Sequence, residues 1–484
     1  MVMSSEFMGH TVFLLLLSLL LVPASTHLQS NDEGHVSVLL SSKGIDFAKD
    51  VLIDKAISSM LPLQLPDIEK SVKIPLIGKV KIVLSNITIY SVEIASSYVE
   101  TGETGLVLVA SGATADLSMN WKYSYSTWIV VISDHGDASV QVKGMDVGFT
   151  VALKEEGGTL KVYVLDCGCH VKDISITLNG GASWLYQGLI DAFEGPIGSA
   201  VENAISKKIK EGIGKLDTRL QSLPKHFAID HTASMNITFV DNPVLSTSSI
   251  EFEINGLFAE VDTVSVPINY YEGTWAPLAC KHPDKMIEIS LHEDVFNSAT
   301  SVYFSTGHML WTVDKFVDQS LLNTASWKFI YPQLYTQYPD DNMTLTITIT
   351  SAPIVKIEDV GINVTIYVDV TVNVLDAGDV IPVACVSLEL SNGCSPQILS
   401  NKLASDLKLK NFNMSLKWSK IGNVHMQLLQ PVMHDIIESV FIPYVNLHLM
   451  RGYALPILHG FTFKNPEIQY AEAEMGICSN LAVT

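Results

Sequence analysis

The residues in this sequence that could carry out covalent or metal chemistry do not form a recognised catalytic motif. His292 and Glu293 begin a zinc-protease pattern, but the second histidine of that pattern is missing. Cys167, Cys169 and His170 have zinc-ligand chemistry, but no second ligand pair follows at a spacing that completes a tetrahedral site. The sequence has neither a Gly-x-Ser-x-Gly elbow nor a phosphate-binding glycine loop. We therefore predict no metal, no cofactor and no enzyme, with a hydrolase whose triad comes from distant positions as the alternative.

The composition excludes the general binding of nucleic acid. The chain has 484 residues and a formal net charge of −21, which is the opposite of the balance that a phosphate backbone requires. Hydrophobic residues make up 48% of the chain and charged residues only 17%, which indicates a large interior or an interior that meets lipid. The length suffices for two domains, and the abundant valine, isoleucine and threonine favour strands.

The N-terminal segment and the sequons predict a secreted, extracellular glycoprotein. Residues 11–22 form an apolar run that is too short to span a bilayer, and the small residues after it suit cleavage, so residues 1–26 are predicted to be a signal peptide. Five glycosylation sequons follow, at Asn86, Asn236, Asn342, Asn363 and Asn413. In an oxidising compartment some of the six cysteines should pair, and Cys385 with Cys394, which flank a predicted turn, is the expected pair.

The elements that must position any site follow the same order twice: a short amphipathic helix, alternating strands and a long apolar helix. In the first half the short helix is predicted over residues 41–60 and the long helix over about 184–220, with a kink at Gly195-Pro196. Apolar residues in the long helix recur every four positions, which is typical of a helix that lies obliquely on a curved sheet. These residues are Leu189, Phe193, Ile197, Val201, Ile205, Ile209 and Ile213.

The second half repeats the order after a Pro- and Ser/Thr-containing stretch, which places a domain boundary near residue 245. A short helix is predicted around residues 291–302 and a long helix around 425–450. Between them, residues 362–374 alternate strictly between branched apolar and polar side chains, which predicts a strand with one face in water. The repeat lies in the order of elements, since the two halves share little residue identity.

Segments along the whole mature chain resemble the bactericidal/permeability-increasing protein and lipopolysaccharide-binding protein (BPI/LBP/PLTP/CETP) family, in its plant branch. The first half contributes Lys-Gly-Ile-Asp-Phe-Ala at 43–48, Leu-Pro-Asp at 65–67, Val-Lys-Ile at 72–74, Gly-Lys at 78–79, Asn-Trp-Lys at 120–122 and Ser-Trp-Leu at 183–185. The second half contributes Leu-His-Glu-Asp-Val-Phe-Asn-Ser-Ala at 291–299 and Gly-Tyr-Ala-Leu-Pro at 452–456. The order and spacing of these segments carry the match, because no single segment is decisive.

The resemblance implies an α+β fold, a boomerang of two pseudo-symmetric elongated antiparallel β-barrels. Each barrel has a short and a very long helix, and a central β-sheet joins the two. We expect an N-terminal lipid-binding barrel at residues 27–240, a linker and central sheet at 241–260 and a C-terminal barrel at 261–484.

The resemblance further implies apolar pockets that hold phospholipid acyl chains, and binding of bacterial lipopolysaccharide through lipid A in innate immune defence. The implied partners are lipopolysaccharide, phospholipids, the bacterial outer-membrane surface and a membrane receptor. A carrier or transfer protein for endogenous phospholipids is the alternative function.

The resemblance also implies a lipopolysaccharide head-group site at the tip of the first barrel. The family's positions fall here on Lys73, Lys79 and Lys122, with Trp121 and Trp128 beside them. Lysines attract the phosphates of lipid A as point charges, and tryptophan suits a membrane–water interface. The alternative is a barrel-end hairpin that carries ordinary surface lysines.

Two departures from the family pattern bear on these expectations. The family's disulfide joins a strand cysteine to one on the long helix, but the helix near residue 204 has no cysteine here. Cys167 and Cys169 are therefore expected either to pair with each other or to stay free. The tip is also less basic than in the strongly cationic members, so lipid binding is expected more than direct killing of bacteria.

Overall fold

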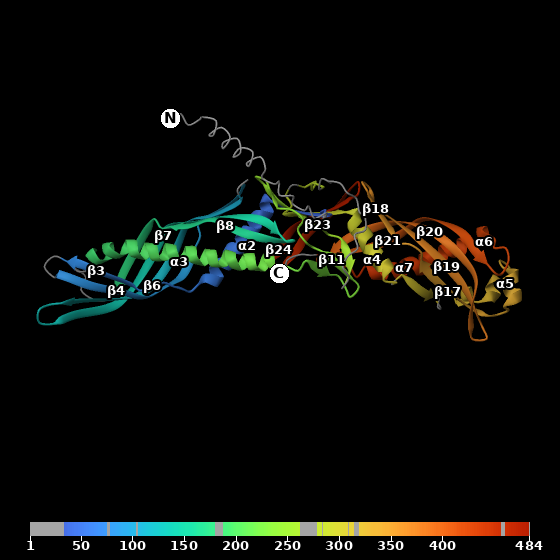
Figure 1. Cartoon of the computed structure of the whole chain (residues 1–484), viewed down its shortest axis with the longest axis horizontal. Coiled ribbons are helices and arrows are strands. Elements are labelled where there is room, and N and C mark those ends of the chain that lie inside the picture. Colours follow the sequence, from blue (N-terminus) through green and yellow to red (C-terminus); the bar gives the residue numbers. More distant parts are fainter. Residues whose placement is uncertain are drawn as a thin grey trace, which may run out of the picture.

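The molecule is elongated, with two sheet-rich halves lying end to end and a central sheet between them (Figure 1). The computed structural model describes residues 33–74, 78–102, 105–179, 187–261, 278–282, 284–307, 309–313, 319–455 and 460–483. The predicted α+β fold of two elongated barrels joined by a central sheet is confirmed. The predicted signal peptide, residues 1–26, and the Ser-Trp-Leu segment at 183–185 lie outside the described residues.

The first barrel is built from an eight-stranded antiparallel sheet. Its main path runs β2-β4-β6-β7-β8, while β3 pairs with β4, β5 with β6 and β9 with β7. The strands are β2 (Leu63–Gln64), β3 (Ile68–Ile74), β4 (Gly78–Glu93), β5 (Ser96–Gly102), β6 (Gly105–Ser126), β7 (Val131–Glu156), β8 (Thr159–His170) and β9 (Asp173–Asn179). Buried and exposed residues alternate along β4 and β6, so one face of the sheet forms a core and the other meets water.

Helix α3 (Gln187–Gln221) packs the middle of its predicted four-residue stripe into that core, while Ile213 belongs to a separate small cluster. The most deeply buried stripe residues, each at most 3% exposed, are Phe193, Ile197, Val201 and Ile205. The helix continues through Pro196, whose missing N–H removes the helical partner of the Ala192 carbonyl. The ammonium of Lys70 on β3 donates a hydrogen bond to that carbonyl at 2.7 Å. A side chain of the sheet thus replaces the bond that the proline eliminates.

The second barrel repeats this plan with a seven-stranded sheet whose path runs β16-β17-β19-β20-β21-β22, with β18 paired to β19. Its strands are β16 (Leu310–Val313), β17 (Asn342–Ile349), β18 (Ile354–Glu358), β19 (Gly361–Asp376), β20 (Asp379–Leu399), β21 (Lys402–Ser419) and β22 (Tyr453–Ala454). The predicted long helix is present as α6 (Met426–Ile436), a π-helical turn (Ile437–Phe441) and α7 (Ile442–Leu449) in direct succession. The short α5 (Pro332–Gln337), which the sequence pattern did not predict, closes the outer end (Figure 1).

The central sheet contains six strands in the order β12-β13-β1-β15-β24-β23. These are β12 (Val244–Leu245), β13 (Ser249–Ile254), β1 (Val36–Ser41), β15 (Ile287–His292), β24 (Glu474–Val483) and β23 (Phe461–Ala471). The predicted segment 241–260 supplies only β12 and β13 to this sheet. The other strands come from both ends of the chain and from the start of the second half, because pairing between distant strands leaves no local signal in the sequence.

Two short helices, α2 and α4, flank the central sheet, and the start of α4 explains the His-Glu pair seen in the sequence. Helix α2 (Ser42–Met60) begins at Ser41, whose hydroxyl oxygen accepts the N–H of Gly44 at 3.3 Å. A Cβ on Gly44 would lie 2.1 Å from the Met286 carbonyl oxygen, so only glycine permits this approach of the first half to the second. Helix α4 (Glu293–Ser305) begins at His292, whose Nδ1 accepts the N–H of Asp294 at 3.3 Å. The His-Glu pair of the sequence is therefore a helix start.

The predicted pairing of Cys385 with Cys394 was wrong, whereas Cys167 and Cys169 stay free, which is one of the two outcomes expected for them. Cys280 and Cys478 form the disulfide, whereas Cys167, Cys169, Cys385 and Cys394 are free thiols. Cys385 and Cys394 both lie on β20, where nine residues of strand hold their Cα atoms roughly 30 Å apart. Cys167 and Cys169 are alternate residues of β8, a spacing of about 6.6 Å that is near the upper limit for a disulfide.

A buried group of ionisable side chains lies where the central sheet meets α4. His35 and His292 are 5% and 7% exposed, and both lie within 4 Å of the Asp294 carboxylate, at 3.8 and 3.3 Å. Glu474 on β24 is the cross-strand partner of His292 and is 6% exposed. Burial lowers the pKa of His35, and it raises the pKa of Glu474 to about 7. The joint between the barrels therefore favours neutral forms of both groups.

Candidate functional site

The outer end of the first barrel presents lysines on the solvent face of β3, β4 and β6. Lys73 and Lys79 stand directly opposite each other across the β3–β4 pair. Lys122 faces the same side from β6, opposite Val83. Opposed side chains in such a pair have Cβ atoms about 5 Å apart, and like charges at that distance repel each other. An anion placed between them would relieve that repulsion.

The neighbouring lysines of this end are already engaged. Lys81 forms a 2.9 Å ion pair with Glu69 on the adjacent strand, and Lys70 donates to the α3 backbone. Within the described part of the chain, Lys73, Lys79 and Lys122 have no acidic partner within 4 Å. The predicted head-group lysines are therefore the three cations of this surface that remain available to a ligand. We call these three the lysine face.

Trp121 lies on the opposite side of the same sheet. Successive residues of a strand point to opposite faces, so Lys122 is exposed while Trp121 is only 4% exposed. Its indole N–H donates to the Asp137 carbonyl oxygen at 3.1 Å, and its ring stacks parallel to Tyr123 with centroids 5.9 Å apart. The structure thus separates Trp121 from the lysine face and places it in the interior. The adjacency of Trp121 and Lys122 within one strand was the signal that sequence reasoning missed.

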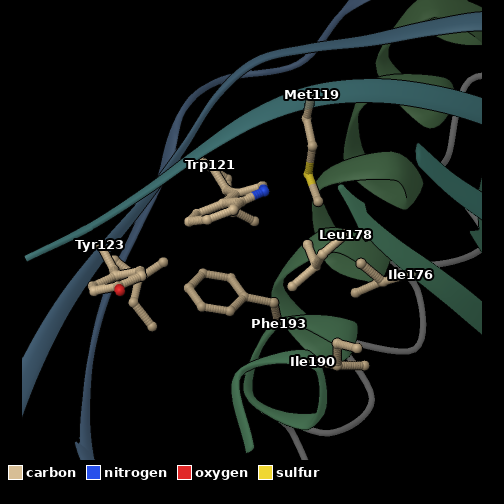
Figure 2. Close-up of a pocket in the computed structure, with 9 residues that line it drawn as sticks. Met119, Trp121, Tyr123, Ile176, Leu178, Ile190 and Phe193 are labelled. Atoms are coloured by element: carbon tan, nitrogen blue, oxygen red, sulfur yellow. The ribbon is translucent and has the colours of Figure 1, made fainter. Parts of the chain in front are cut away.

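The stacked rings line a small apolar cavity between the sheet and the first turns of α3 (Figure 2). Phe193 projects from α3 toward Trp121 and Tyr123. Gly136 lies against the indole. A Cβ at Gly136 would be 2.7 Å from the Trp121 ring, so glycine makes room for the indole. The lining residues are Ile82, Leu84, Met119, Trp121, Tyr123, Ile176, Leu178, Ile190 and Phe193. The open volume is about 20 Å³, which accommodates a water molecule but not an acyl chain.

Beyond the lysine face, the β6–β7 turn carries Trp128 at the extreme end of the barrel. Trp128 is 94% exposed, and the apolar residues that follow it are also exposed. Trp128 is therefore separated from Trp121 by the length of the hairpin, and the two predicted aromatic site residues occupy different environments. One is packed in the core and the other stands in water.

The second barrel contains another apolar cavity, at its outer end. Its open volume is about 50 Å³, room for a few water molecules. The lining consists of Leu321, Trp327, Tyr331, Leu334, Met343, Leu345, Val370, Val372, Ala384, Val386, Ile421, Val424, Leu429, Met433 and Ile436. The Tyr331 side chain is 5% exposed, and burial raises the pKa of its hydroxyl to about 12. The family resemblance implied an apolar pocket in this barrel but not its lining residues, because the lining combines β17, β19 and β20 with α5 and α6 from distant parts of the chain.

The remaining predicted positions are distributed over the surface. Asn86, Asn342 and Asn413 are exposed, whereas Asn236 and Asn363 are partly buried. The Cys167-Gly-Cys169-His170 segment forms no metal-ligand cluster among the described residues. Burial raises the pKa of Cys169 to about 12, so its thiol stays protonated. Across the described helices, none is long and apolar enough to cross a membrane.

Comparisons with known proteins agree with this architecture over both halves. The model of the LBP / BPI / CETP family N-terminal domain matches residues 44–217, and that of the C-terminal domain matches residues 227–483. A BPI/LBP family protein of Arabidopsis thaliana is 50% identical over 473 residues, which cover 97% of this chain and 96% of the relative.

More distant relatives match over a similar length. The bactericidal permeability-increasing protein of Sebastes schlegelii is 26% identical, over 93% of this chain and 95% of its own. Human lipopolysaccharide-binding protein is 25% identical, over 92% of each chain. The crystal structure of lipopolysaccharide binding protein superposes with a TM-score of 0.63 at 20% identity, covering 93% of this chain and 99% of that chain. The chain belongs to the LBP/BPI/CETP family of lipid-binding proteins.

Proposed function

We propose that this protein is secreted and binds bacterial lipopolysaccharide in defence against bacteria. The supporting observation is the lysine face, where Lys73 lies opposite Lys79, and Lys122 lies on the same face opposite Val83; the three have no acidic partners among the described residues. Lipid A carries phosphates, which accept charge-assisted hydrogen bonds from ammonium groups. The relatives named lipopolysaccharide-binding protein and bactericidal permeability-increasing protein match over 92% and 93% of this chain.

The apolar interior supports a place for acyl chains close to the head group. Trp121 and Lys122 are adjacent residues on opposite faces of β6, so one strand separates the lysine face from the cavity. The cavity is lined by apolar and aromatic side chains, which suit a hydrocarbon tail. Since the open volume is about 20 Å³, entry of an acyl chain requires Phe193 to move away from the stacked rings.

The test is a charge reversal of the lysine face, Lys73→Glu, Lys79→Glu and Lys122→Glu in one chain. Hydrogen bonds to charged groups contribute about 1.5–3 kcal/mol each, so the triple variant should bind lipopolysaccharide at least about a hundredfold more weakly at low salt. The wild-type affinity should fall as salt rises, and the variant's should not, because exposed charges are screened. Titration calorimetry with purified lipopolysaccharide at two salt concentrations measures both effects.

The matched control reverses three exposed lysines of α3, Lys207, Lys210 and Lys215, which changes the net charge equally. The control variant should keep the wild-type affinity. Equal lipopolysaccharide affinity of the lysine-face variant and the wild type would refute the head-group site. An equal loss of affinity in the lysine-face variant and the α3 control would show that overall charge, not this site, determines binding.

A carrier of endogenous phospholipids is the second candidate, favoured by the cavity of the second barrel. All its lining residues are uncharged. Such a site would hold a lipid by its tail and would not select an anionic head group. Mass spectrometry of lipid extracted from the purified protein distinguishes the two functions. A host phospholipid that lipopolysaccharide fails to displace would support the carrier and count against the defence role.

A further inference from the structure

Asn86 differs from the other predicted glycosylation positions in how little the rest of the protein engages its side chain. The side chain is exposed, and its carboxamide makes no hydrogen bond within the part of the chain that the structure describes. Thr88, which completes the sequon, donates its hydroxyl to the backbone carbonyl oxygen of Asn86 at 3.3 Å. The side-chain nitrogen that would receive an N-linked glycan is therefore not engaged by the protein.

A bulge in β4 explains why Asn86 is exposed. Leu84 and Ile87 are buried on the core face, at 3% and 0% exposure. Strict alternation allows one residue between two core positions, but here there are two, Ser85 and Asn86, and the β4–β6 register shifts between Ser85 and Thr88. The φ angle of Asn86 is 52°, in the left-handed region that asparagine adopts more readily than most residues. The bulge thus keeps Asn86 away from the core and on the solvent side.

The two partly buried sequon asparagines are held by neighbouring side chains. The Oδ1 of Asn236 accepts both the N–H and the hydroxyl of Thr238, at 3.0 and 2.8 Å. The Nδ2 of Asn363 donates to Glu358 at 2.8 Å, and its Oδ1 accepts a hydrogen bond from Lys410. A glycan on either asparagine would have to displace these contacts.

The other two sequon asparagines are exposed but also hydrogen-bonded, and both lie in the second barrel. The Oδ1 of Asn342 on β17 accepts from Asn323 at 3.2 Å, and the Nδ2 of Asn413 on β21 donates to Glu389 at 3.3 Å. In the first half, Asn86 is therefore the sequon position that can carry a glycan without losing a contact to the described residues.

Asn86 also lies at the border of the lysine face. It follows Val83 by three residues of β4, a distance of about 10 Å, and Val83 is directly opposite Lys122. Lys79 lies seven residues from Asn86 in the other direction of the strand, about 23 Å away toward the outer end. A group attached to Asn86 would thus stand beside Lys122 and far from Lys79 and its partner Lys73.

We propose that Asn86 carries an N-linked glycan that borders the lysine face and limits the access of large ligands to Lys122. The proposal rests on the proposed function, which assigns the chain to the secretory route and the lysines to a head group. In the modification, the Asn86 nitrogen bonds to the anomeric carbon of a lipid-linked oligosaccharide donor, whose pyrophosphate leaves, and the nitrogen loses one proton. An N-linked glycan is bulky and lies on the surface. It would therefore hinder an aggregate that approaches Lys122 while leaving Lys73 and Lys79 open at the outer end.

The test uses the full chain secreted from eukaryotic cells. Mass spectrometry of its glycopeptides should find Asn86 occupied. Thr88→Ala removes the sequon but keeps Asn86, and Lys122 should then react severalfold faster with a bulky amine-reactive biotin ester, whereas the rate for Lys73 should not change. The affinity for lipopolysaccharide aggregates should rise severalfold in the same variant.

Three further variants serve as controls for this change. Thr88→Ser keeps the sequon and should behave as the wild type. Asn86→Gly removes the sequon and suits the left-handed backbone, so it should behave as Thr88→Ala does. Ser415→Ala removes the Asn413 sequon of the second barrel and should leave the labelling of Lys122 unchanged.

The outcomes separate this proposal from the proposed function, because glycan occupancy and lysine labelling are measured without lipopolysaccharide. An unmodified Asn86 in the secreted protein would overturn the proposal. Equal labelling of Lys122 in the wild type and in Thr88→Ala would overturn the shielding, and so would faster labelling in Thr88→Ser or Ser415→Ala. Failure of the lysine-face charge reversal to weaken lipopolysaccharide binding would refute the head-group site, yet the occupied Asn86 and the shielded Lys122 would still support the glycan.

Discussion

Replacing Phe193 with alanine tests whether the first cavity is a compartment for lipid tails or simply part of the core. The ring is 3% exposed and projects toward Trp121 and Tyr123 (Figure 2). An aromatic side chain buries roughly 150–250 Å², which at about 25 cal/mol per Å² corresponds to about 4–6 kcal/mol. Because alanine retains part of this burial, we expect the first barrel to lose about 3–5 kcal/mol of stability.

The same change should improve the binding of an apolar ligand. Removal of the ring enlarges a cavity whose open volume is now about 20 Å³, and apolar cavities of about 150 Å³ bind benzene-sized molecules. We expect a fluorescent single-chain lipid to bind more tightly to Phe193→Ala than to the wild type and to restore part of the lost stability. Native-state hydrogen exchange of β4, β6 and β9 gives the local stability with and without the lipid.

Ile197→Ala is the matched control, since Ile197 is 0% exposed on the next turn of α3 but does not line the cavity. It should destabilise by about 2–5 kcal/mol without any gain in lipid affinity. A loss of less than about 1 kcal/mol in Phe193→Ala would contradict the packing described for its ring. Equal lipid affinity in both variants would show that the cavity beside Trp121 is not where tails bind.

Three further changes have defined outcomes. Cys478→Ser removes a disulfide that joins residues 198 positions apart. From chain entropy, the free energy of unfolding should fall by up to about 5 kcal/mol. The urea midpoint of the variant should be lower than that of the wild type, and reducing agent should no longer shift it. In the folded protein the pKa of Glu474 is raised from 4.5 to about 7. The stability that the neutral carboxyl contributes is therefore complete below pH 4.5 and is lost as the pH rises through 7. Glu474→Gln should raise the melting temperature at pH 8 but not at pH 4.5, whereas the control Glu472→Gln, at an exposed position, should change it at neither pH. Gly136→Val should displace the Trp121 ring and shift the fluorescence emission of Trp121 to longer wavelength. An unaltered emission spectrum would contradict the close contact between Gly136 and the indole.

The repeated helices and strands could be predicted because their signals are local. The four-residue stripe on α3, the cap at Ser41 and the alternation along β19 each depend on neighbouring residues alone. The family resemblance implied a central sheet, but its strand order and the disulfide could not be predicted from local signals, since they join segments hundreds of residues apart. Cys280 and Cys478 appear isolated in the sequence, and only the pairing of β15 with β24 brings them together.

The site shows the same division between local and non-local information. The sequence and the family resemblance identified Lys73, Lys79 and Lys122, and the β3–β4 and β4–β6 registers show that these lysines share one face. The alternation of a strand would have assigned Trp121 to the face opposite Lys122 without any structure. The uncharged apolar run at residues 128–132 is visible in the sequence, but its exposure depends on how far the β6–β7 hairpin projects.

The position of β1 has a consequence for how the chain is made. This strand lies between β13 and β15, and β15 is paired on its other side with β24, which follows it by almost 200 residues. During synthesis from the N-terminus, one edge of β15 therefore remains open until β24 has been made. Cys280 likewise remains a free thiol until Cys478 has been made. A chain that stops before β24 would thus contain two almost complete barrels with an unprotected strand edge between them, and such edges are where aggregation begins.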